Sequence, residues 1–363
     1  GPAGVPAVTN NNSSQVTLEG TMAAINATLG DPGGLLYTPN ENANGTDDLV
    51  VLADDLGNFG GTNEPATDTK TVRITIAAVN DAPQVTVPAS SPAAPWQVDE
   101  DTDRLVAGVS VADVDAAEGT GQVRLTATVV NGTLTVSTNV PSGVPATGIS
   151  ANGSSSITMT GTPAQINATL AGAVGYPGLT YRGRLDYFGP DQLTVRVNDL
   201  GNSGAGGALE AVGSVTIEVV AKNDPPIAVG DSFSMAERHP TDPTRPPLTV
   251  TGSVLTSNDS PGPANEAGSQ TVQLVPGGFG TPSQGTLSYD PANDRVLYTP
   301  PAYFNGTATF TYTIIDDGDP AQTAVGTVTV TVTPVNDPPV PGADAGTTNE
   351  DTPRTFTAVQ LLV

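Results

Sequence analysis

The sequence predicts an all-β fold made of tandem β-sandwich repeats in an extended array, and three observations carry this prediction. Gly and Pro number 41 and 33 in a chain of 363 residues, and such a content leaves little room for long helices. Runs of alternating Val, Thr and Ile, such as TVTVTVTPV at 327–335, have the period of strands with one buried face. A linker phrase also recurs at intervals of about one sandwich domain, ~100 residues or somewhat more.

The linker phrase follows a strand-like run in three places. It reads AAVNDAP at 77–83, VAKNDPP at 220–226 and TPVNDPP at 333–339. Asn and Asp before Pro favour turns by themselves, with no metal. A single copy therefore indicates only a turn, whereas recurrence at three points indicates the ends of three repeats.

A second set of phrases recurs inside the repeats. LLYTPNENANG at 35–45 aligns with LTYRGRLDYFG at 179–189 and with VLYTPPAYFNG at 296–306. The phrase INATL occurs at both 25–29 and 166–170. Matches of this kind identify homologous repeats, and the coarse structure expected within each repeat is all β.

These matches divide the chain into four segments. Residues 1–81 form the later part of a repeat that lacks its first strands, 82–224 and 225–337 form complete repeats, and 338–363 supply the opening strands of another. The chain opens on Gly1 without an initiator Met or a signal-like start, so we expect an internal fragment or a processed product.

The incomplete end segments allow two interpretations. In the first, they are parts of a longer array of repeats. In the second, the strand-like segment 347–363 of one copy completes the truncated sandwich 1–81 of another copy. Such strand donation would give head-to-tail polymers.

The charge of the chain is one-sided, since 37 Asp and Glu against 12 Lys and Arg give a formal net charge of −25. Nucleic acids and anionic membrane surfaces are therefore poor partners, because phosphate binding needs clustered bases. No stretch of the sequence is long and apolar enough to span a bilayer. Divalent cations held by carboxylates would relieve the self-repulsion.

The residue types that catalysis needs are scarce. The chain has no Cys and a single His, His239, which leaves thiolate sites, zinc sites and His-based triads almost nothing to work with. Pairs of carboxylates can hydrolyse glycosides, but the acids here recur at the ends of repeats rather than in one cleft. We therefore expect no enzyme activity.

Several motifs carry a resemblance to a known family. They are the VNDPP linker, the EDT starts at 98–102 and 348–352, GSVLTSND at 252–259 and VADVDA at 111–116. In this order they resemble the cadherin-like and VCBS-type tandem repeats of very large bacterial surface proteins. The resemblance implies seven-stranded Greek-key sandwiches of the cadherin or immunoglobulin type, end-to-end stacking, Ca²⁺ between neighbouring repeats, and an extracellular role in adhesion or as a spacer.

The linkers are the expected cation sites, because Ca²⁺ takes about six to eight oxygen ligands and a linker can combine acids from two repeats. The acids of the linker, the DxD motif and a late loop resemble cadherin-type ligands. The expected ligands are Asn80, Asp81, Asp113, Asp115 and Asp199 at the first linker; Glu100, Asn223, Asp224, Asp259 and Asp316 or Asp317 at the second; and Glu237, Asn336 and Asp337 at the third, with further ligands expected beyond Val363.

Two functions are consistent with the sequence. The first is structural: a calcium-stiffened stalk, adhesin or filament segment at a bacterial surface, whose partners are the neighbouring repeats of the same chain. The second is a binding module in which sandwich loops recognise a surface glycan or protein. The insert of the second repeat, at about 131–156, is the expected place for such recognition.

Overall fold

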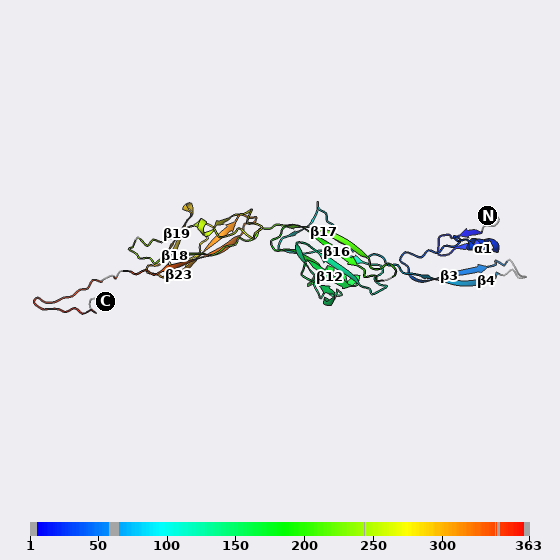
Figure 1. Ribbon diagram of the computed structural model, residues 1–363, viewed down its shortest axis with the longest axis horizontal. Helices are drawn as coiled ribbons and strands as arrows, with labels where there is room; N and C mark the ends of the chain where they lie inside the picture. The colour runs from blue at the N-terminus through cyan, green and yellow to red at the C-terminus, as the bar shows by residue number, and fades with distance from the viewer. Residues whose placement is uncertain are drawn as a thin grey trace. The chain divides into compact units, whose positions relative to one another are not determined.

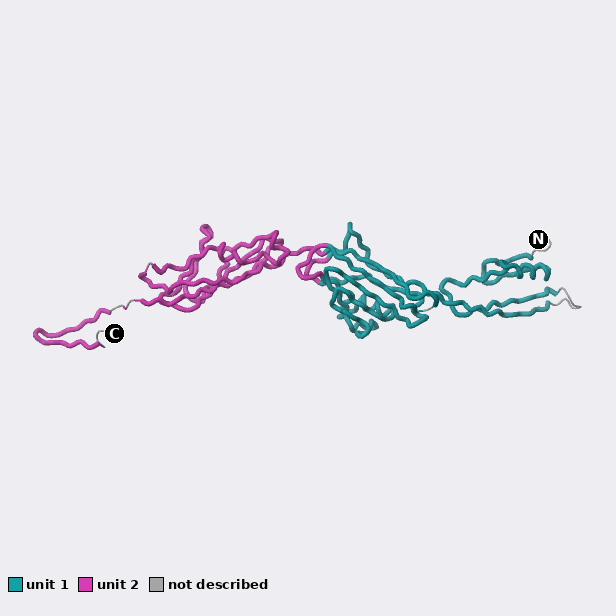
Figure 2. The backbone as a smooth tube through the Cα atoms, viewed as in Figure 1, with its two compact units in different colours: residues 1–97, 103–182, 190–218 teal, residues 98–102, 183–189, 219–363 magenta. Residues whose placement is uncertain are grey.

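The computed structural model describes residues 6–57, 65–202, 204–242, 244–337, 339 and 342–358. The chain divides into two compact units (Figures 1 and 2). Unit 1 comprises Gly1–Gln97, Asp103–Arg182 and Pro190–Glu218, and unit 2 comprises Val98–Thr102, Gly183–Gly189 and Val219–Val363. Strands dominate both units, so the predicted all-β fold is confirmed.

The first part of unit 1 contains two strand pairs and a helix. Strands β1 and β2 pair antiparallel, and so do the ten-residue strands β3 and β4. The elements are β1 (Ala7–Thr9), β2 (Thr17–Glu19), α1 (Met22–Gly30), β3 (Gly45–Asp54) and β4 (Thr67–Ile76).

The next stretch forms a six-stranded sheet in the order β11-β12-β9-β16-β17-β6 and a three-stranded sheet in the order β10-β15-β7. Two small pairs, β5 with β8 and β13 with β14, complete it. The elements are β5 (Gln84–Thr86), β6 (Trp96–Asp99), β7 (Asp103–Leu105), β8 (Ser110–Ala112), β9 (Val123–Thr128), β10 (Gly132–Thr135), η1 (Ala146–Gly148), β11 (Ile149–Ser150), β12 (Ser156–Gly161), α2 (Pro163–Ala171), β13 (Gly172–Ala173), β14 (Tyr176–Pro177), β15 (Thr180–Gly183), β16 (Gly189–Asn198) and β17 (Glu210–Val220).

The sandwich of unit 2 has a four-stranded sheet in the order β18-β24-β23-β20 and a three-stranded sheet in the order β19-β22-β21. Strand β18 runs parallel to β24, and the other pairs are antiparallel. The elements are β18 (Asp231–Ala236), β19 (Leu248–Thr251), α3 (Gly252–Leu255), β20 (Val272–Leu274), β21 (Thr286–Asp290), η2 (Pro291–Asn293), β22 (Arg295–Thr299), β23 (Gly306–Asp316) and β24 (Thr323–Thr333).

The two sandwiches share one strand order. In chain order, the strands β6, β7, β9, β10, β15, β16 and β17 take the places that β18 to β24 take in unit 2. The difference is an insert, because β11 and β12 extend the larger sheet of unit 1 beyond β9. The stretch at about 131–156 contributes β10, β11 and the start of β12 to the sheets, and Val140 and Val144 of the loop between β10 and β11 are buried.

Alternating side chains make the core of the unit 2 sandwich. Phe310, Tyr312 and Ile314 of β23 are buried together with Val296 and Tyr298 of β22, so both sheets contribute to one core. The intervening threonines of β23 are more exposed, as the period of the strand predicts.

Short helices lie between the strands of these predominantly β repeats. Thr162 caps α2, since its hydroxyl accepts from Gln165 N and the Gln165 side chain accepts from Thr162 N. This capping box fixes the first turn, and Ile166 and Leu170 of α2 are buried. The hydroxyl of Thr21 caps the aligned helix α1 by accepting from Ala24 N, with Ala24 in the place of Gln165.

No helix among the described residues is long and apolar enough to cross a membrane. The proposed donor segment 347–363 is described only as far as residue 358, and residues 359–363 lie outside the described part. Residues 342–357 contain no strand.

Candidate cation sites at the linkers

The first linker is held by the side chain of Asn80, which is buried. Its amide Nδ2 donates to Asp199 Oδ2 at 2.6 Å and to the Gly207 carbonyl at 2.9 Å. Its backbone N–H donates to the carbonyl of Ala205 at 3.0 Å. Asn80 therefore joins the end of one strand run to the loop that follows β16 of the next repeat.

Asp81 contacts the DxD motif of the following repeat, 82–224. Its backbone N–H donates to Asp115 Oδ2, and the N–H of Asp115 donates to Asp113 Oδ1 at 2.9 Å. Burial raises the pKa of Asp113 above its ordinary value, and the negative charges of Asp199 and Asp115 add to the increase. The structure thus brings the five expected residues of this linker together.

The second linker repeats the two contacts of the first. Asn223 Nδ2 donates to Asp316 Oδ1 at 3.1 Å and to the Pro320 carbonyl at 3.0 Å. The backbone N–H of Asp224 donates to Glu266 Oε1 at 3.0 Å. Glu266 therefore takes the place that the DxD aspartate takes at the first linker.

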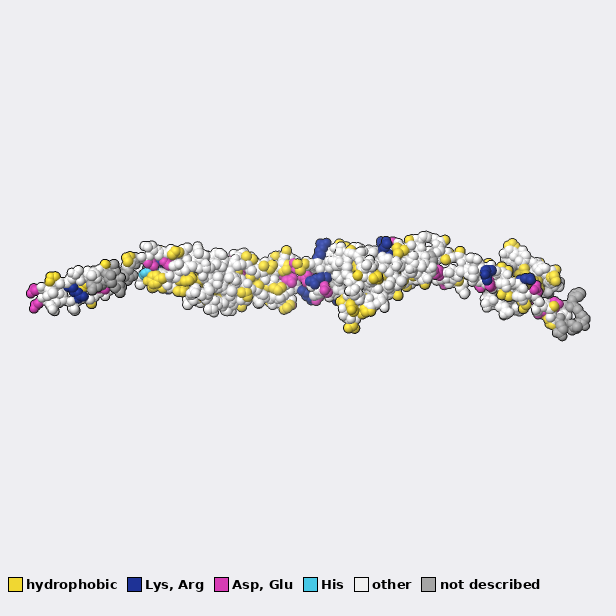
Figure 3. Space-filling model, turned by 90° about the horizontal axis from the view of Figure 1, so that it is seen from below, with side chains coloured by type: hydrophobic (Ala, Val, Ile, Leu, Met, Phe, Trp, Pro, Cys, Tyr) yellow, Lys and Arg dark blue, Asp and Glu magenta, His cyan; other side chains and the backbone are white. Residues whose placement is uncertain are grey.

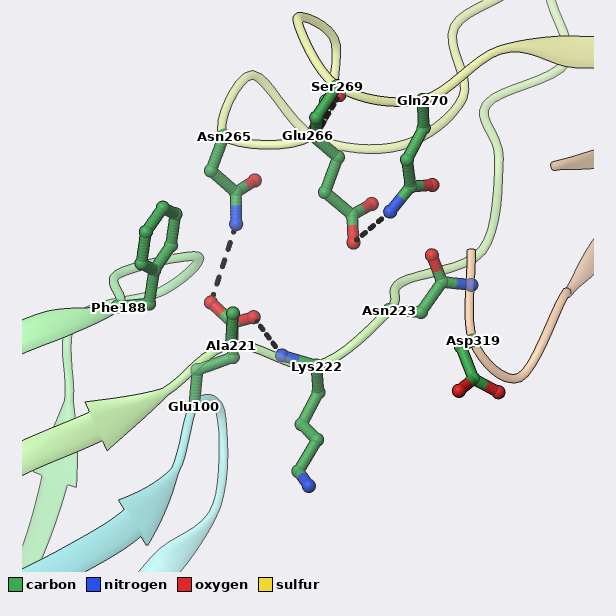
Figure 4. A pocket seen from close by; sticks show the side chains of 10 residues that line it. All are labelled: Glu100, Phe188, Ala221, Lys222, Asn223, Asn265, Glu266, Ser269, Gln270 and Asp319. Atoms are coloured by element: carbon green, nitrogen blue, oxygen red, sulfur yellow. Dashed lines mark hydrogen bonds between the residues drawn. The ribbon is translucent and has the colours of Figure 1, made fainter. Parts of the chain in front are cut away.

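Glu100 lies under the second linker and is only 2% exposed. Its Oε1 accepts from Lys222 N at 2.6 Å and its Oε2 from Asn265 Nδ2 at 3.4 Å (Figure 4). Burial raises the pKa of Glu100, with the nearby charge of Asp224 adding to the effect. The carboxylates of Glu100 and Glu266 line a pocket of about 230 Å³, and the Lys222 ammonium points away from the Glu100 carboxylate.

Three further carboxylates meet beside this pocket. Oxygens of Asp101, Asp186 and Asp224 all lie within 4.8 Å of one another, and Asp186 N donates to the Asp101 carboxylate at 3.3 Å. At that separation each ionised pair repels by ~1 kcal/mol in water, and more strongly near a low-dielectric wall. Such a group of oxygens favours a cation.

Buried oxygens without a hydrogen-bond donor concentrate at these two linkers. Nine buried side-chain atoms among the described residues lack a partner, and all nine are acceptor oxygens. The first linker holds two of them, the second linker holds six, and the ninth belongs to Asp231. The atoms at the linkers are Asn80 Oδ1 and Asp113 Oδ2; and Asn223 Oδ1, Asp224 Oδ2, Asn265 Oδ1, Glu266 Oε2, Gln270 Oε1 and Asp316 Oδ2.

Two residues expected at the second linker lie elsewhere. Asp259 follows the short helix α3 and points into the sandwich, where it accepts from Val229 N at 2.7 Å and lies 3.2 Å from the hydroxyl of Tyr312. Asp317 turns to Thr271, whose N–H and hydroxyl donate to its two oxygens at 2.7 and 2.8 Å. Asp316, and not Asp317, contacts the linker.

Sequence reasoning missed three acids of the second linker. Asp101 follows Glu100 in the EDT start, and Asp186 lies in the phrase LDYFG of the recurrent motif. Asp101 and Asp186 both lie within recurrent phrases, so the repeat pattern contains a signal for them. Glu266 lies in a loop that carries no DxD motif, so only the fold reveals its place.

The third linker is built differently. Glu237 is buried and accepts from Val335 N at 2.9 Å, as Glu100 accepts from Lys222 N at the second linker. Asp337, however, is paired with Arg245, and Asn336 is exposed.

The surface view agrees with this clustering. Asp and Glu side chains gather in small groups on the visible face, and the surface between the groups is mostly uncharged (Figure 3).

Sheets paired into sandwiches and repeated along the chain, with acids gathered where the repeats join, define a tandem sandwich-repeat protein. Residues 223–334 match the family model of the bacterial cadherin-like domain. Over this part of the chain, the resemblance to bacterial cadherin-like repeats that the sequence predicts is confirmed. No curated protein matches the chain.

Solved structures of cadherin repeats are also similar to the chain. Protocadherin gammaB7 EC3-6 is 14% identical with a TM-score of 0.29, and the match covers 90% of this chain and 66% of that one. Protocadherin Gamma B2 extracellular cadherin domains 1-5 is 13% identical with a TM-score of 0.33, and the match covers 92% of this chain and 53% of that one. Mouse Cadherin-23 EC22-24 is 15% identical with a TM-score of 0.28, and the match covers 92% of this chain and 84% of that one. The chain thus spans two thirds or less of the two protocadherin structures.

Proposed function

We propose that this chain is a non-catalytic, extracellular segment of a bacterial surface protein, whose repeats are stiffened by Ca²⁺ at the linkers 80–81 and 223–224. The family match over 223–334 supports a repeat module. The cation, the location and the mechanical role go beyond that match.

One observation carries the proposal: eight buried acceptor oxygens at two similarly built linkers have no donor among the described residues. Leaving a buried polar atom unpaired costs ~1–3 kcal/mol, so eight such atoms at two points need a common explanation. A hard cation satisfies acceptor oxygens and needs no donor. Calcium fits better than magnesium, because the ligand sets are large and include amide oxygens.

At each linker, some hydrogen bonds would hold the carboxylates in place and leave other oxygens free to bind the ion. Asn80 and Asn223 use the amide nitrogen to fix the late-loop aspartates, which leaves the amide oxygen available to the ion. The linker N–H groups fix one oxygen of Asp115 and one of Glu266. A bound ion supplies positive charge where these carboxylates converge.

The consequence is mechanical. Without an ion, the acids of the second linker repel one another and favour a looser arrangement. With an ion, acids from both sides of the linker share one centre, so the direction of the chain through the linker is fixed.

The test uses the whole chain in Ca²⁺, in Mg²⁺ and in EDTA. We expect Ca²⁺ to raise the calorimetric melting temperature and to narrow the range of conformations seen by small-angle scattering, with a smaller effect of Mg²⁺. An ion at 100 times its Kd stabilises the folded state by ~2.7 kcal/mol. An unchanged melting temperature and an unchanged scattering curve in EDTA would falsify the proposal.

We also propose the boundaries 1–81, 82–224, 225–337 and 338–363 for the repeats. The shared strand order of the two sandwiches supports the two central segments. Glycan or protein recognition through sandwich loops, and strand donation by 347–363, stay predictions.

A further inference from the structure

The third linker shares the backbone contacts of the second but lacks two of its aspartates. Glu237 N donates to the Thr333 carbonyl at 2.9 Å, and Val335 N donates back to Glu237 Oε1 at 2.9 Å. Glu100 makes the same two contacts with Val220 and Lys222. Asp337 follows the bonded amide of Val335 by two residues, and Asp224 follows that of Lys222 by two residues. Asp337 is therefore the counterpart of Asp224.

Two carboxylates of the second linker are replaced at the third. Arg238 stands directly after Glu237, where Asp101 follows Glu100. Tyr303 stands where the aligned phrase places Asp186. The structure supports this alignment, because Asp186 and Tyr303 both have a positive φ, of 55° and 60°. Tyr303 N also donates to the carbonyl of Arg238 at 3.0 Å.

Asp337 is neutralised by a guanidinium. Arg245 Nη1 lies 2.7 Å from Asp337 Oδ1, and Arg245 Nε lies 3.1 Å from Asp242 Oδ2. Thr244 donates to the other oxygen of Asp242 from both its N–H and its hydroxyl, which fixes the carboxylate that orients Arg245.

The burial of Arg245 separates this contact from an ordinary surface ion pair. Its side chain is 14% exposed, whereas the other basic side chains in ion pairs of the described residues are 46–78% exposed. Exposed pairs contribute little because water and salt screen them. A pair this enclosed is screened far less.

The described acids of the third linker also hold no buried oxygen without a hydrogen-bond partner. None of the nine orphaned atoms of the described residues belongs to Glu237, Asp242 or Asp337. The second oxygen of Glu237 accepts from Asn305 Nδ2 at 3.2 Å. The described residues around 336–337 thus offer a cation fewer free carboxylate oxygens than those around the second linker.

We infer that Arg245 closes the linker at 336–337 in place of a cation, so that this linker keeps its order when divalent ions are removed. An arginine stays charged at any physiological pH and cannot be chelated. Arg245 and Arg238 would also repel a divalent ion from the Asp337 carboxylate. The chain then carries two kinds of linker, and the contrast with 223–224 rests on the proposed calcium function.

The first test is hydrogen exchange, followed by mass spectrometry of the whole chain in Ca²⁺ and in EDTA. The amides of Lys222 and Asp224 report on the second linker, and the amide of Val335 reports on the third. We expect EDTA to speed exchange at least several-fold at 222–224 and to leave 335 unchanged. Calcium-dependent protection at 335 as large as that at 222–224 would overturn the inference.

The second test is Arg245→Gln, with Arg196→Gln as the matched control. Arg196 makes an equally short pair with Glu210, at 2.6 Å, but its side chain is 53% exposed. We expect R245Q to speed exchange around residue 335 in both buffers, and R196Q to leave it unchanged. An R245Q variant with wild-type exchange at 335 contradicts the role of Arg245, even if the protein binds no calcium at all.

A third variant tests the converse. Combining R245Q with Arg238→Asp and Tyr303→Asp rebuilds, around Asp337, the three-acid group that Asp101, Asp186 and Asp224 form at the second linker. We expect exchange around residue 335 to become sensitive to EDTA in this variant. If all three linkers ignore EDTA in the wild-type chain, the calcium proposal fails, and the R245Q result alone decides the role of Arg245.

Discussion

The side-chain amide of Asn80 donates to Asp199 at 2.6 Å, and Asn223 makes the same contact with Asp316 at 3.1 Å. Asparagine suits this position because it presents a donor to the aspartate and keeps an acceptor oxygen on its other side. Aspartate offers two acceptors and no donor when ionised.

The first prediction concerns Asn80→Asp. The new carboxylate would face Asp199 at hydrogen-bond distance, so we expect a lower melting temperature in EDTA. The new carboxylate also gives Ca²⁺ one more charged ligand, so Ca²⁺ should restore most of the lost stability. Differential scanning calorimetry in Ca²⁺ and in EDTA measures both effects.

Asn293→Asp is the control for this change. Asn293 also donates to an aspartate, Asp290 at 2.7 Å, but on the surface and away from any linker. Its effect should be small and equal in the two buffers. An N80D variant that loses the same stability with and without Ca²⁺ argues against an ion at the first linker.

The second prediction concerns Glu266→Gln. The amide oxygen of Gln can still accept from Asp224 N, so the fold is retained while one negative ligand is lost. We expect calcium affinity at the second linker to fall on the order of tenfold or more. Isothermal titration of the whole chain, analysed for two classes of site, measures this loss.

Asp317→Asn is the matched control for E266Q. Sequence alone made Asp317 a candidate ligand, but its oxygens bind Thr271 in the structure. Calcium binding by D317N should equal that of the wild type. Equal losses in both variants would indicate a general effect of charge rather than a site at Glu266.

The linker residues, Glu266 and Asp259 show how far the candidate site could be predicted from the sequence. The linker residues were found because each linker phrase is short, local and repeated. Glu266 was not found, because it reaches Asp224 only through the folding of a loop that has no counterpart phrase in the other repeats. Asp259 was misplaced for the opposite reason: its phrase resembles a ligand motif, but α3 turns it toward Tyr312 in the core.

The helices give the same lesson. The phrase that contains INATL was recognised as a repeat, but its capping signal was not used. Thr162 and Gln165 are three residues apart and form the capping box, a local signal that sequence alone carries. By contrast, no local signal indicates that Arg245 meets Asp337, which lies far along the chain and is reached only through the fold.

The third prediction concerns pH in the absence of calcium. Burial raises the pKa of Glu100, Asp113, Asp224 and Glu266 in the folded chain. The folded state then binds protons more tightly than the unfolded state, so stability falls as pH rises through the raised pKa values. We expect the melting temperature in EDTA to increase as the pH is lowered from about 7 to about 5.

Calcium should reverse the sign of this slope. An ion favours the ionised carboxylates, so protons compete with it, and stability in Ca²⁺ should fall over the same range. Below about pH 4 both slopes turn downward, because hydrogen bonds lower the pKa of acids such as Asp242 and Asp317. Parallel slopes with and without Ca²⁺ would show that these acids do not bind it.

The last prediction separates the sandwich core from the linkers. Tyr181 is fully buried, and its hydroxyl donates to Asp191 at 2.9 Å. The carboxylate of Asp191 also accepts from the N–H groups of Val130 and Asn131, at 3.0 Å each. Tyr181→Phe removes one partner of a buried carboxylate and should lower the free energy of unfolding by ~1–3 kcal/mol. Urea denaturation followed by circular dichroism measures this.

Tyr37→Phe is the comparison that the repeat itself provides. Tyr37 is aligned with Tyr181 and donates to Asp47 at the same 2.9 Å, but this pair is exposed. Water can replace the lost partner there, so Y37F should leave the unfolding curve unchanged. Neither loss should depend on Ca²⁺, because neither tyrosine contacts a linker. A calcium-dependent loss in Y181F would mean that the sandwich and its linkers unfold as one cooperative unit, contrary to the additive behaviour expected of stacked repeats.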